Sequence, residues 1–117
     1  EELVAESLRM QINAAVADSL GLCVFGRSVT DENLELIANA INDAFDAGVT
    51  PSFIRNIGVE TLRLEAAFNN AAGFGEDDDE LPAFFLEEPL PPTGKMARLY
   101  SREVNAAMQN LMEAQSL

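Results

Sequence analysis

The sequence predicts an all-α fold: a small irregular bundle of four to five helices with a long crossover loop rich in proline and acidic residues. Apolar residues recur at helical spacing in four segments, and no segment shows the sustained alternation of a half-buried strand. The chain has 117 residues, of which 48% are hydrophobic and 23% are charged. This size and composition predict one folded domain over residues 1–117 rather than a disordered chain.

The first two predicted helices are marked by their ends. The first runs to about Asp18 and is expected to stop at Gly21. The second is expected to begin at Thr30 or Asp31, both favourable N-caps, and to be closed by Gly48. The apolar stripe of the first helix consists of Val4, Leu8, Ile12 and Val16. The expected buried face of the second consists of Leu34, Ile37, Ile41 and either Ala44 or Phe45.

The third predicted helix has the clearest start, because Thr50 is a good cap and Pro51 suits the first helical position. Gly73 is its expected end. Gly58 inside this helix costs about 1 kcal/mol relative to alanine, which predicts a close approach of another backbone. The apolar residues that share one face of this helix are Ile54, Ile57, Leu64 and Phe68.

Between residues 74 and 99 the helical pattern breaks into an acidic run, residues 76–80, and a stretch with four of the five prolines. We expect an ordered but irregular crossover, and a solvated acidic loop rather than a calcium site, because the ligand spacing of an EF-hand is missing. The apolar residues expected to dock on the core are Leu81, Phe84, Phe85, Leu86 and Leu90. A last helix is expected to be capped by Ser101 and to carry Val104, Met108, Leu111 and Met112 on one side.

Charge and residue usage exclude several classes of function. Twenty acidic and seven basic residues give a net charge of −13, which repels phosphate backbones and anionic lipids. Nucleic acids and membranes are therefore not expected partners. Histidine is absent, so Ser-His or Cys-His catalysis is excluded for this chain alone. The single cysteine, Cys23, excludes an internal disulfide, and with the missing signal segment it predicts a cytoplasmic location.

The segment most informative about chemistry is residues 18–23, Asp-Ser-Leu-Gly-Leu-Cys. A helix end would supply a carboxylate, the glycine a sharp turn with free backbone amides, and the cysteine a thiolate, all within one loop. A carboxylate can accept two parallel N–H bonds from a planar amino-heterocycle such as a pterin, and a thiolate can bind a soft metal. From residue type and spacing alone, however, a buried Cys23 and an Asp18 that merely caps or forms the turn are the commoner arrangement.

The pattern Asp-x-x-Gly-Leu-Cys at residues 18–23 resembles the pterin- and cluster-binding motif of the aldehyde:ferredoxin oxidoreductase family. The likeness continues in the same order along the chain. Residues 64–74 are similar to the family's LE-x-x-FN-x-x-x-GF stretch, and residues 78–82 and 88–91 resemble its acidic-LP and EPLP segments. Gly-Val-Glu at residues 58–60, where family members usually carry Gly-Glu-Arg, leaves the subfamily and the aldehyde substrate open.

The resemblance implies that the chain is a helical fragment from the C-terminal part of a larger tungsten-dependent enzyme. Such an enzyme oxidises aldehydes to carboxylic acids and passes the electrons through a [4Fe–4S] cluster to ferredoxin. In this fragment Asp18 would bind one pterin of a tungsten bis-pterin (molybdopterin-type) cofactor, and Leu20, Gly21 and Leu22 would frame it. Cys23 would be the fourth ligand of the cluster.

The same resemblance implies that no catalytic residue lies in this fragment, and that the isolated fragment is inactive and binds neither cofactor. The expected partners are the remaining domains of its own enzyme and ferredoxin, and a homodimer of the full enzyme is a further option. Tungsten and molybdenum are not distinguished by the sequence.

Two alternatives from other classes stay open on the sequence. The tripeptide Asp18-Ser19-Leu20 resembles the prosthetic-group site of an acyl-carrier-like protein, with Ser19 as the modified residue, although a carrier serine normally opens a helix. The other alternative is a purely structural helical interaction module, in which Cys23 has no role in binding a cluster.

Overall fold

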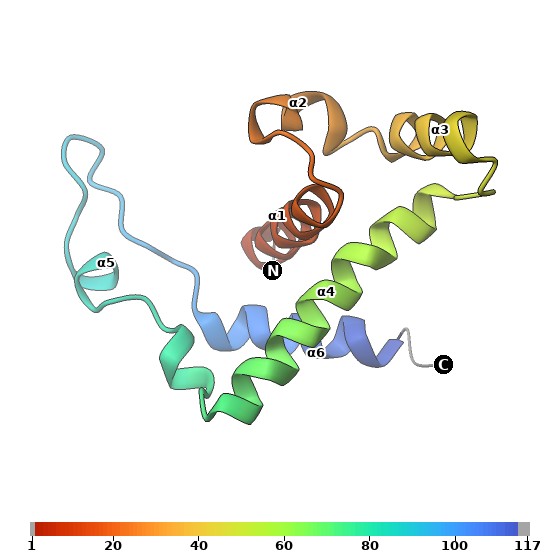
Figure 1. Cartoon of the computed structure of the whole chain (residues 1–117). Helices are drawn as coiled ribbons and strands as arrows, with labels where there is room; N and C mark the ends of the chain where they lie inside the picture. The colour runs from red at the N-terminus through yellow and green to blue at the C-terminus, as the bar shows by residue number, and fades with distance from the viewer. Residues whose placement is uncertain (1, 115–117) are drawn as a thin grey trace. The chain divides into compact units, whose positions relative to one another are not determined.

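The fold is described from a computed structural model, which covers residues 2–114. Within these residues the structure is all-α, and it contains no strand beyond one isolated antiparallel bridge between Leu90 and Lys95. The predicted fold class is therefore confirmed. The elements are α1 (Glu2–Ser19), η1 (Val24–Gly26), α2 (Arg27–Thr30), α3 (Leu34–Phe45), α4 (Pro51–Ala72), η2 (Glu76–Asp79), α5 (Phe84–Glu87) and α6 (Ser101–Ala114) (Figure 1).

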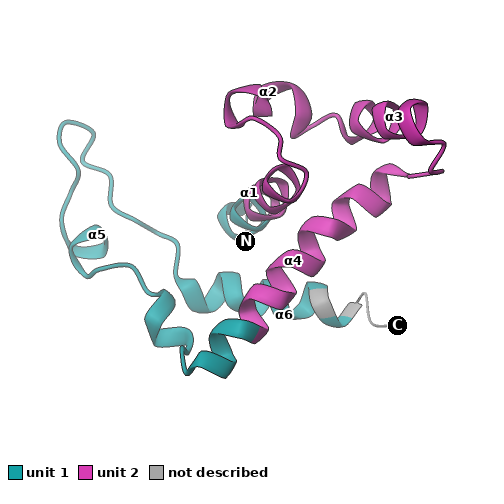
Figure 2. Ribbon diagram, viewed as in Figure 1, with its two compact units in different colours: residues 1–8, 68–117 teal, residues 9–67 magenta. Residues whose placement is uncertain are grey.

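The chain divides into two compact units, residues 9–67 and residues 1–8 with 68–117 (Figure 2). The prediction of a single domain over residues 1–117 stays a prediction. Among the described residues, none of the helices is both long enough and apolar enough to cross a membrane.

The unit of residues 9–67 has a well-defined apolar core between α1, α3 and α4. Its centre is formed by Val16 from α1, Ile37 and Ala38 from α3, and Ile54 from α4, of which Ile54 is completely buried. Burial of apolar surface of this kind is the main force that holds helices together. The partly buried residues packed against this centre are Leu20, Leu22, Leu34, Ile41, Val49 and Ile57.

Helix α4 begins as the sequence predicts, and it crosses α1 at Gly58. The hydroxyl of Thr50 accepts a hydrogen bond from the backbone N–H of Phe53 (3.2 Å), so Thr50 is the cap and Pro51 is the first helical residue. At Gly58, an added Cβ would lie 2.5 Å from the backbone oxygen of Ile12 and 2.8 Å from Cγ2 of Val16. The close backbone approach expected at Gly58 is confirmed, because only a residue without a side chain fits this crossing.

The boundaries of the second long helix differ from the prediction. Helix α3 begins at Leu34 and is capped by Asn33, whose side chain accepts from the backbone N–H of Leu36 (3.2 Å). The predicted caps lie elsewhere. Thr30 is the last residue of the short α2, and Asp31 follows that helix. The helix ends at Phe45, before Gly48, and both Ala44 and Phe45 are exposed. Several polar residues precede this helix in the sequence. The sequence alone does not indicate which of their side chains accepts a hydrogen bond from the free N–H groups of the first turn.

A side-chain clamp closes the connection between α3 and α4. The amide of Asn42 donates to the backbone oxygen of Val49 (2.8 Å), and its carbonyl accepts from the backbone N–H of the same residue (2.7 Å). One side chain therefore satisfies both polar backbone groups of a loop residue that is partly buried against the core. Nothing in the spacing of residues 42–49 indicates this clamp.

The second unit contains the crossover, which is irregular as predicted. Its turns are held by side chains and by backbone contacts: Asp78 accepts from the N–H of Gly75 (2.7 Å), and Asp79 accepts from the amide of Asn105 (2.9 Å). The expectation that its apolar residues dock on a core is wrong for most of them. Leu86 is half-buried. The other four expose 42–64% of their surface: Leu81, Phe84, Phe85 and Leu90.

Two further expectations need correction. Ser101 does not cap α6, because it lies inside the first turn, where the backbone oxygen of Tyr100 accepts from Glu103 (3.0 Å) and the Ser101 hydroxyl has no partner.

On α4, the apolar face is buried only in its first half, since Leu64 and Phe68 are 57% and 73% exposed. On α6, Val104 is buried and Met108 and Leu111 are half-buried, while the Met112 side chain lies outside the described residues.

Candidate cofactor-binding loop

The candidate loop begins where α1 ends in a glycine-dependent cap. Gly21 has a positive φ of 66°, a conformation that glycine adopts without strain. The N–H of Leu22 donates to the oxygen of Ala17 (2.8 Å), and the N–H of Gly21 donates to the oxygen of Asp18 (3.2 Å). This pair of bonds is the Schellman pattern, which satisfies carbonyls left free at a helix end. The predicted stop at Gly21 is confirmed.

The cap uses the loop's backbone amides, which corrects one expectation. Leu20 donates to the oxygen of Val16 (3.0 Å), so the N–H groups of residues 20–22 are all engaged within the chain. They are not free to bind a ligand. The backbone oxygens of residues 20–22 accept no hydrogen bond within the described part of the chain. The backbone of residues 20–22 therefore offers a ligand acceptors rather than donors.

The side chains of the loop divide into two sets. Leu20 and Leu22 are partly buried and pack against the core of the unit. Asp18 and Cys23 are exposed, and Cys23 is a free cysteine. Cys23 is thus not the buried small residue that its type and spacing alone favoured. The two leucines anchor the loop, and the acid and the thiol at its two ends remain accessible.

Asp18 does not serve the helix end electrostatically. It lies in the last turn of α1, where the backbone dipole is negative, and that turn contains no basic residue. A carboxylate at this position opposes the dipole by about 0.3–1 kcal/mol. Its side chain makes no hydrogen bond or ion pair within residues 2–114, and the cap is made by backbone groups alone. Of the alternative roles, Asp18 therefore forms the turn through its backbone oxygen, which accepts from Gly21, and its side chain does not cap the helix.

The residues that follow Cys23 form a short, apolar and uncovered segment. The oxygen of Cys23 accepts from the N–H of Gly26 (2.9 Å), which starts the 3-10 turn η1. Val24 and Phe25 are 62% and 93% exposed. The next cation, Arg27, pairs with Asp31 through Nε and Oδ1 at 3.4 Å, so its charge is directed to that carboxylate.

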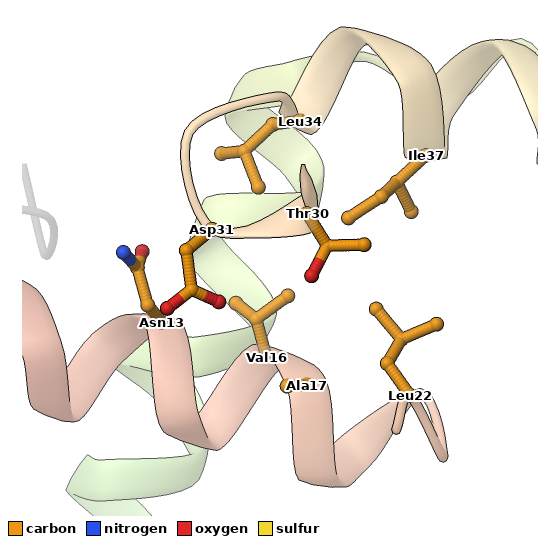
Figure 3. A pocket seen from close by; sticks show the side chains of 8 residues that line it. All are labelled: Asn13, Val16, Ala17, Leu22, Thr30, Asp31, Leu34 and Ile37. Atoms are coloured by element: carbon orange, nitrogen blue, oxygen red, sulfur yellow. The ribbon is translucent and has the colours of Figure 1, made fainter. Parts of the chain in front are cut away.

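A shallow depression lies beside the loop, between α1 and the start of α3 (Figure 3). It holds about 180 Å³ of empty space that includes open solvent, and it leaves no enclosed room for a ligand of the size that typical pockets accept. Figure 3 shows the side chains of Leu22 and Ile37 directed toward its centre. We interpret it as the uneven surface of the core rather than as a cofactor cleft.

Two further ion pairs of this unit lie on its surface, Arg9 with Glu32 (3.7 Å) and Arg63 with Glu60 on α4. Arg63 donates to Glu60 through Nε (2.9 Å) and through a second nitrogen. Hydrogen bonding from Arg63 lowers the pKa of Glu60, and the same bond raises the pKa of Arg63. Exposed pairs of this kind contribute little to stability, and this pair takes no part in the loop.

The donor set fits one part of a shared cofactor site rather than a complete site. Among residues 2–114, no three histidine, cysteine or acidic side chains are grouped so that they could hold a metal ion. A [4Fe–4S] cluster takes four cysteine thiolates, of which Cys23 can supply one. The carboxylate of Asp18 and the free carbonyls beside it suit the N–H groups of a pterin. The residues present therefore fit both groups as partial ligands.

The geometry gives no support to an acyl carrier. A carrier serine opens a helix, whereas Ser19 is the last residue of α1. Its hydroxyl lies 3.2 Å from that of Thr61 on α4, so it is already engaged in a contact within the core unit.

Together these features define an all-α domain with an exposed thiol and an exposed carboxylate on one glycine-capped loop. The chain matches the family model described as "Aldehyde ferredoxin oxidoreductase, domains 2 & 3" over residues 2–114. It therefore belongs to the aldehyde ferredoxin oxidoreductase family, and the resemblance seen in the sequence is confirmed. The chain is thus part of an oxidoreductase-type protein. No curated protein and no solved structure matches it.

Proposed function

We propose that this chain supplies one pterin-binding loop and one cluster ligand to a tungsten-dependent aldehyde oxidoreductase. When bound, the tungsten–pterin centre and the [4Fe–4S] cluster supply the two-electron oxidation of an aldehyde to a carboxylic acid and the transfer of electrons to ferredoxin. The observation that carries the proposal is the division of the loop, with Leu20 and Leu22 packed against the core and Asp18 and Cys23 exposed.

Asp18 would hold the pterin ring by accepting two of its N–H groups. A carboxylate in a rigid position can accept two parallel bonds from a planar donor, as it does from arginine. Leu20, Gly21 and Leu22 would frame the ring through their backbone oxygens, because their N–H groups are used by the helix cap. The unfavourable position of Asp18 at the negative end of α1 supports a binding role, since the charge does not stabilise the helix.

Cys23 would supply the fourth thiolate of the cluster, and the other three would come from the remaining domains of the same enzyme. The exposed Val24 and Phe25 support burial of this end of the loop in the full enzyme, because apolar surface gains free energy when it is covered. On this proposal the isolated fragment has no activity and holds no cluster. The full enzyme acts in the cytoplasm with ferredoxin as its partner, and a homodimer is compatible with this role.

Replacement of Cys23 by alanine in the full-length enzyme tests the proposal. Loss of one of four thiolates should lower the iron content per chain and abolish the electron paramagnetic resonance signal of an intact [4Fe–4S] cluster, or replace it with that of a three-iron species. Val29→Ala is the control, because it truncates an exposed side chain on α2 outside the loop and leaves the thiol in place. An unchanged iron content and spectrum in Cys23→Ala would instead support the structural interaction module.

A further inference from the structure

The end of α1 is attached to α4 by a hydroxyl pair with a defined direction. The Ser19 and Thr61 hydroxyl oxygens lie 3.2 Å apart, and the Thr61 hydroxyl also donates to the backbone oxygen of Ile57 (2.8 Å). A hydroxyl has one proton and a carbonyl oxygen can only accept, so the Thr61 proton faces Ile57. Ser19 is then the donor and Thr61 the acceptor in the bond between the two helices.

This bond continues the contact made at Gly58. Gly58 admits the backbone of Ile12 and the side chain of Val16, and Thr61 meets Ser19 one turn further along α4. Residues 12, 16 and 19 lie on one face of α1, and residues 58 and 61 lie on one face of α4. Contacts at both points of a helix face fix how the helix is rotated about its own axis.

The rotation of α1 decides where the loop points. Asp18 precedes Ser19 by one residue and therefore projects about 100° away from it around the helix. Gly21 and Leu22 continue directly from this turn through the capping bonds to Asp18 and Ala17. A change in the orientation of the last turn would thus redirect both the carboxylate and the segment that leads to Cys23.

We infer that Thr61 is a positioning residue for the cofactor loop: by accepting the hydrogen bond of Ser19, it fixes the orientation in which α1 presents Asp18 and Cys23. This inference rests on the proposed function of the loop. Thr61 lies on a different helix from the loop, far from it in sequence, and nothing in the motif at residues 18–23 indicates its role.

The test compares Thr61→Val with Thr61→Ser in the cofactor-loaded full-length enzyme. Valine keeps the shape of threonine and removes the hydroxyl, whereas serine keeps the hydroxyl. Partners that hydrogen-bond a metal ligand directly change cofactor affinity or activity by roughly 10–100-fold. The Ser19–Thr61 bond is exposed and acts one residue removed from Asp18, so we expect Thr61→Val to retain its pterin and cluster a few-fold less tightly. We also expect an altered cluster resonance spectrum, and recovery of both properties in Thr61→Ser.

Ser19→Ala should reproduce the effect of Thr61→Val, and the double variant should be no worse than either one, because both remove the same bond. Ser28→Ala is the control, since the hydroxyl of this exposed serine on α2 makes no hydrogen bond within the described chain. A Thr61→Val enzyme with the normal spectrum and cofactor retention would overturn the inference, even if its melting temperature fell. If Cys23→Ala loses the cluster in the same experiment, the proposed function survives that result; if it does not, the proposed function itself fails.

Discussion

Two helices in this chain end in the same backbone pattern and in different surroundings. At the end of α4, Gly73 donates to the oxygen of Asn70 (3.1 Å) and Phe74 to that of Asn69 (3.0 Å), which repeats the arrangement around Gly21. Leu22, after the first glycine, packs on the core, whereas Phe74, after the second, is 57% exposed. The backbone cap therefore shows only that the helix ends. The packing of the following side chain against a core distinguishes a candidate binding loop from an ordinary turn.

The two ends also differ in charge at the equivalent position. Asp18 and Asn70 each accept the bond from the following glycine through their backbone oxygen, so one end carries a carboxylate where the other carries a neutral amide. Asparagine is the better choice for stability at the negative end of a helix. A carboxylate that the helix does not need is a reason to look for a ligand at α1 and not at α4.

Gly58→Ala should have the largest effect, because it would separate the α1 end from the helix that supports it. The new Cβ would lie 2.5 Å from a backbone oxygen, which cannot move without shifting α1. Overpacking costs about 1–3 kcal/mol, and a clash this close to a backbone atom belongs at the upper end of that range, from which the gain of about 1 kcal/mol in helix propensity is subtracted. We expect a net loss of about 2 kcal/mol in the free energy of unfolding, measured by urea denaturation and far-ultraviolet circular dichroism. Ala66→Gly on the exposed part of α4 is the control, since it should cost only the propensity term.

Leu22→Ala should lower the free energy of unfolding more than Phe74→Ala, because the two side chains differ in how well they are packed. Leu22 is partly buried on the core, so its truncation should destabilise the chain by about 1–2 kcal/mol, below the 2–5 kcal/mol of a fully buried leucine. Phe74 is mostly exposed and should cost less than about 0.5 kcal/mol. Thermal melts of the two variants would measure the difference. Equal losses would mean that Phe74 is as well packed as Leu22, against the structure.

Asp18→Asn and Asn70→Asp should have small effects on stability, and these effects should be opposite in sign. Removing the carboxylate from the end of α1 should stabilise the chain by about 0.3–1 kcal/mol, and adding one to the end of α4 should destabilise it by a similar amount, both less in high salt. The proposed function adds that Asp18→Asn weakens pterin retention in the full enzyme although the fold gains stability. Tungsten content after gel filtration measures pterin retention. An Asp18→Asn enzyme that is less stable than the parent and keeps its full tungsten content would contradict both the expected gain in stability and the expected loss of pterin.

The sequence predicted those parts of the fold that depend on local chemistry. Thr50 with Pro51, Gly21 and Gly73 act through the backbone of their own turn, and Gly58 costs enough in a helix to reveal a close neighbour. These four features were confirmed. In the loop, residues 18–23 were recognisable as a motif, but the exposure of Cys23 was not predictable, because it depends on which neighbouring residues turn toward the core.

The parts that were wrong depend on what covers a surface. Helical spacing places Leu64 and Phe68 on the same face as Ile54, but it does not tell how far along α4 another helix extends to bury that face. The same holds for the exposed Phe84 and Phe85 in the crossover. The expectation of free backbone amides in the loop was wrong for a related reason. Carbonyl groups at a helix end have no partner inside the helix, and here they accept hydrogen bonds from the N–H groups of the loop.

The clamp formed by Asn42 makes one position between α3 and α4 intolerant of replacements that look mild. An aspartate has nearly the same shape, but it has no N–H group and would place a negative charge against the backbone oxygen of Val49, which the amide now satisfies. A shorter or longer link between the helices would likewise carry Val49 out of reach of the side chain. Related sequences should therefore keep the number of the intervening residues 46–48, and they should keep Gly48, whose φ of 66° suits glycine, more strictly than Ala47.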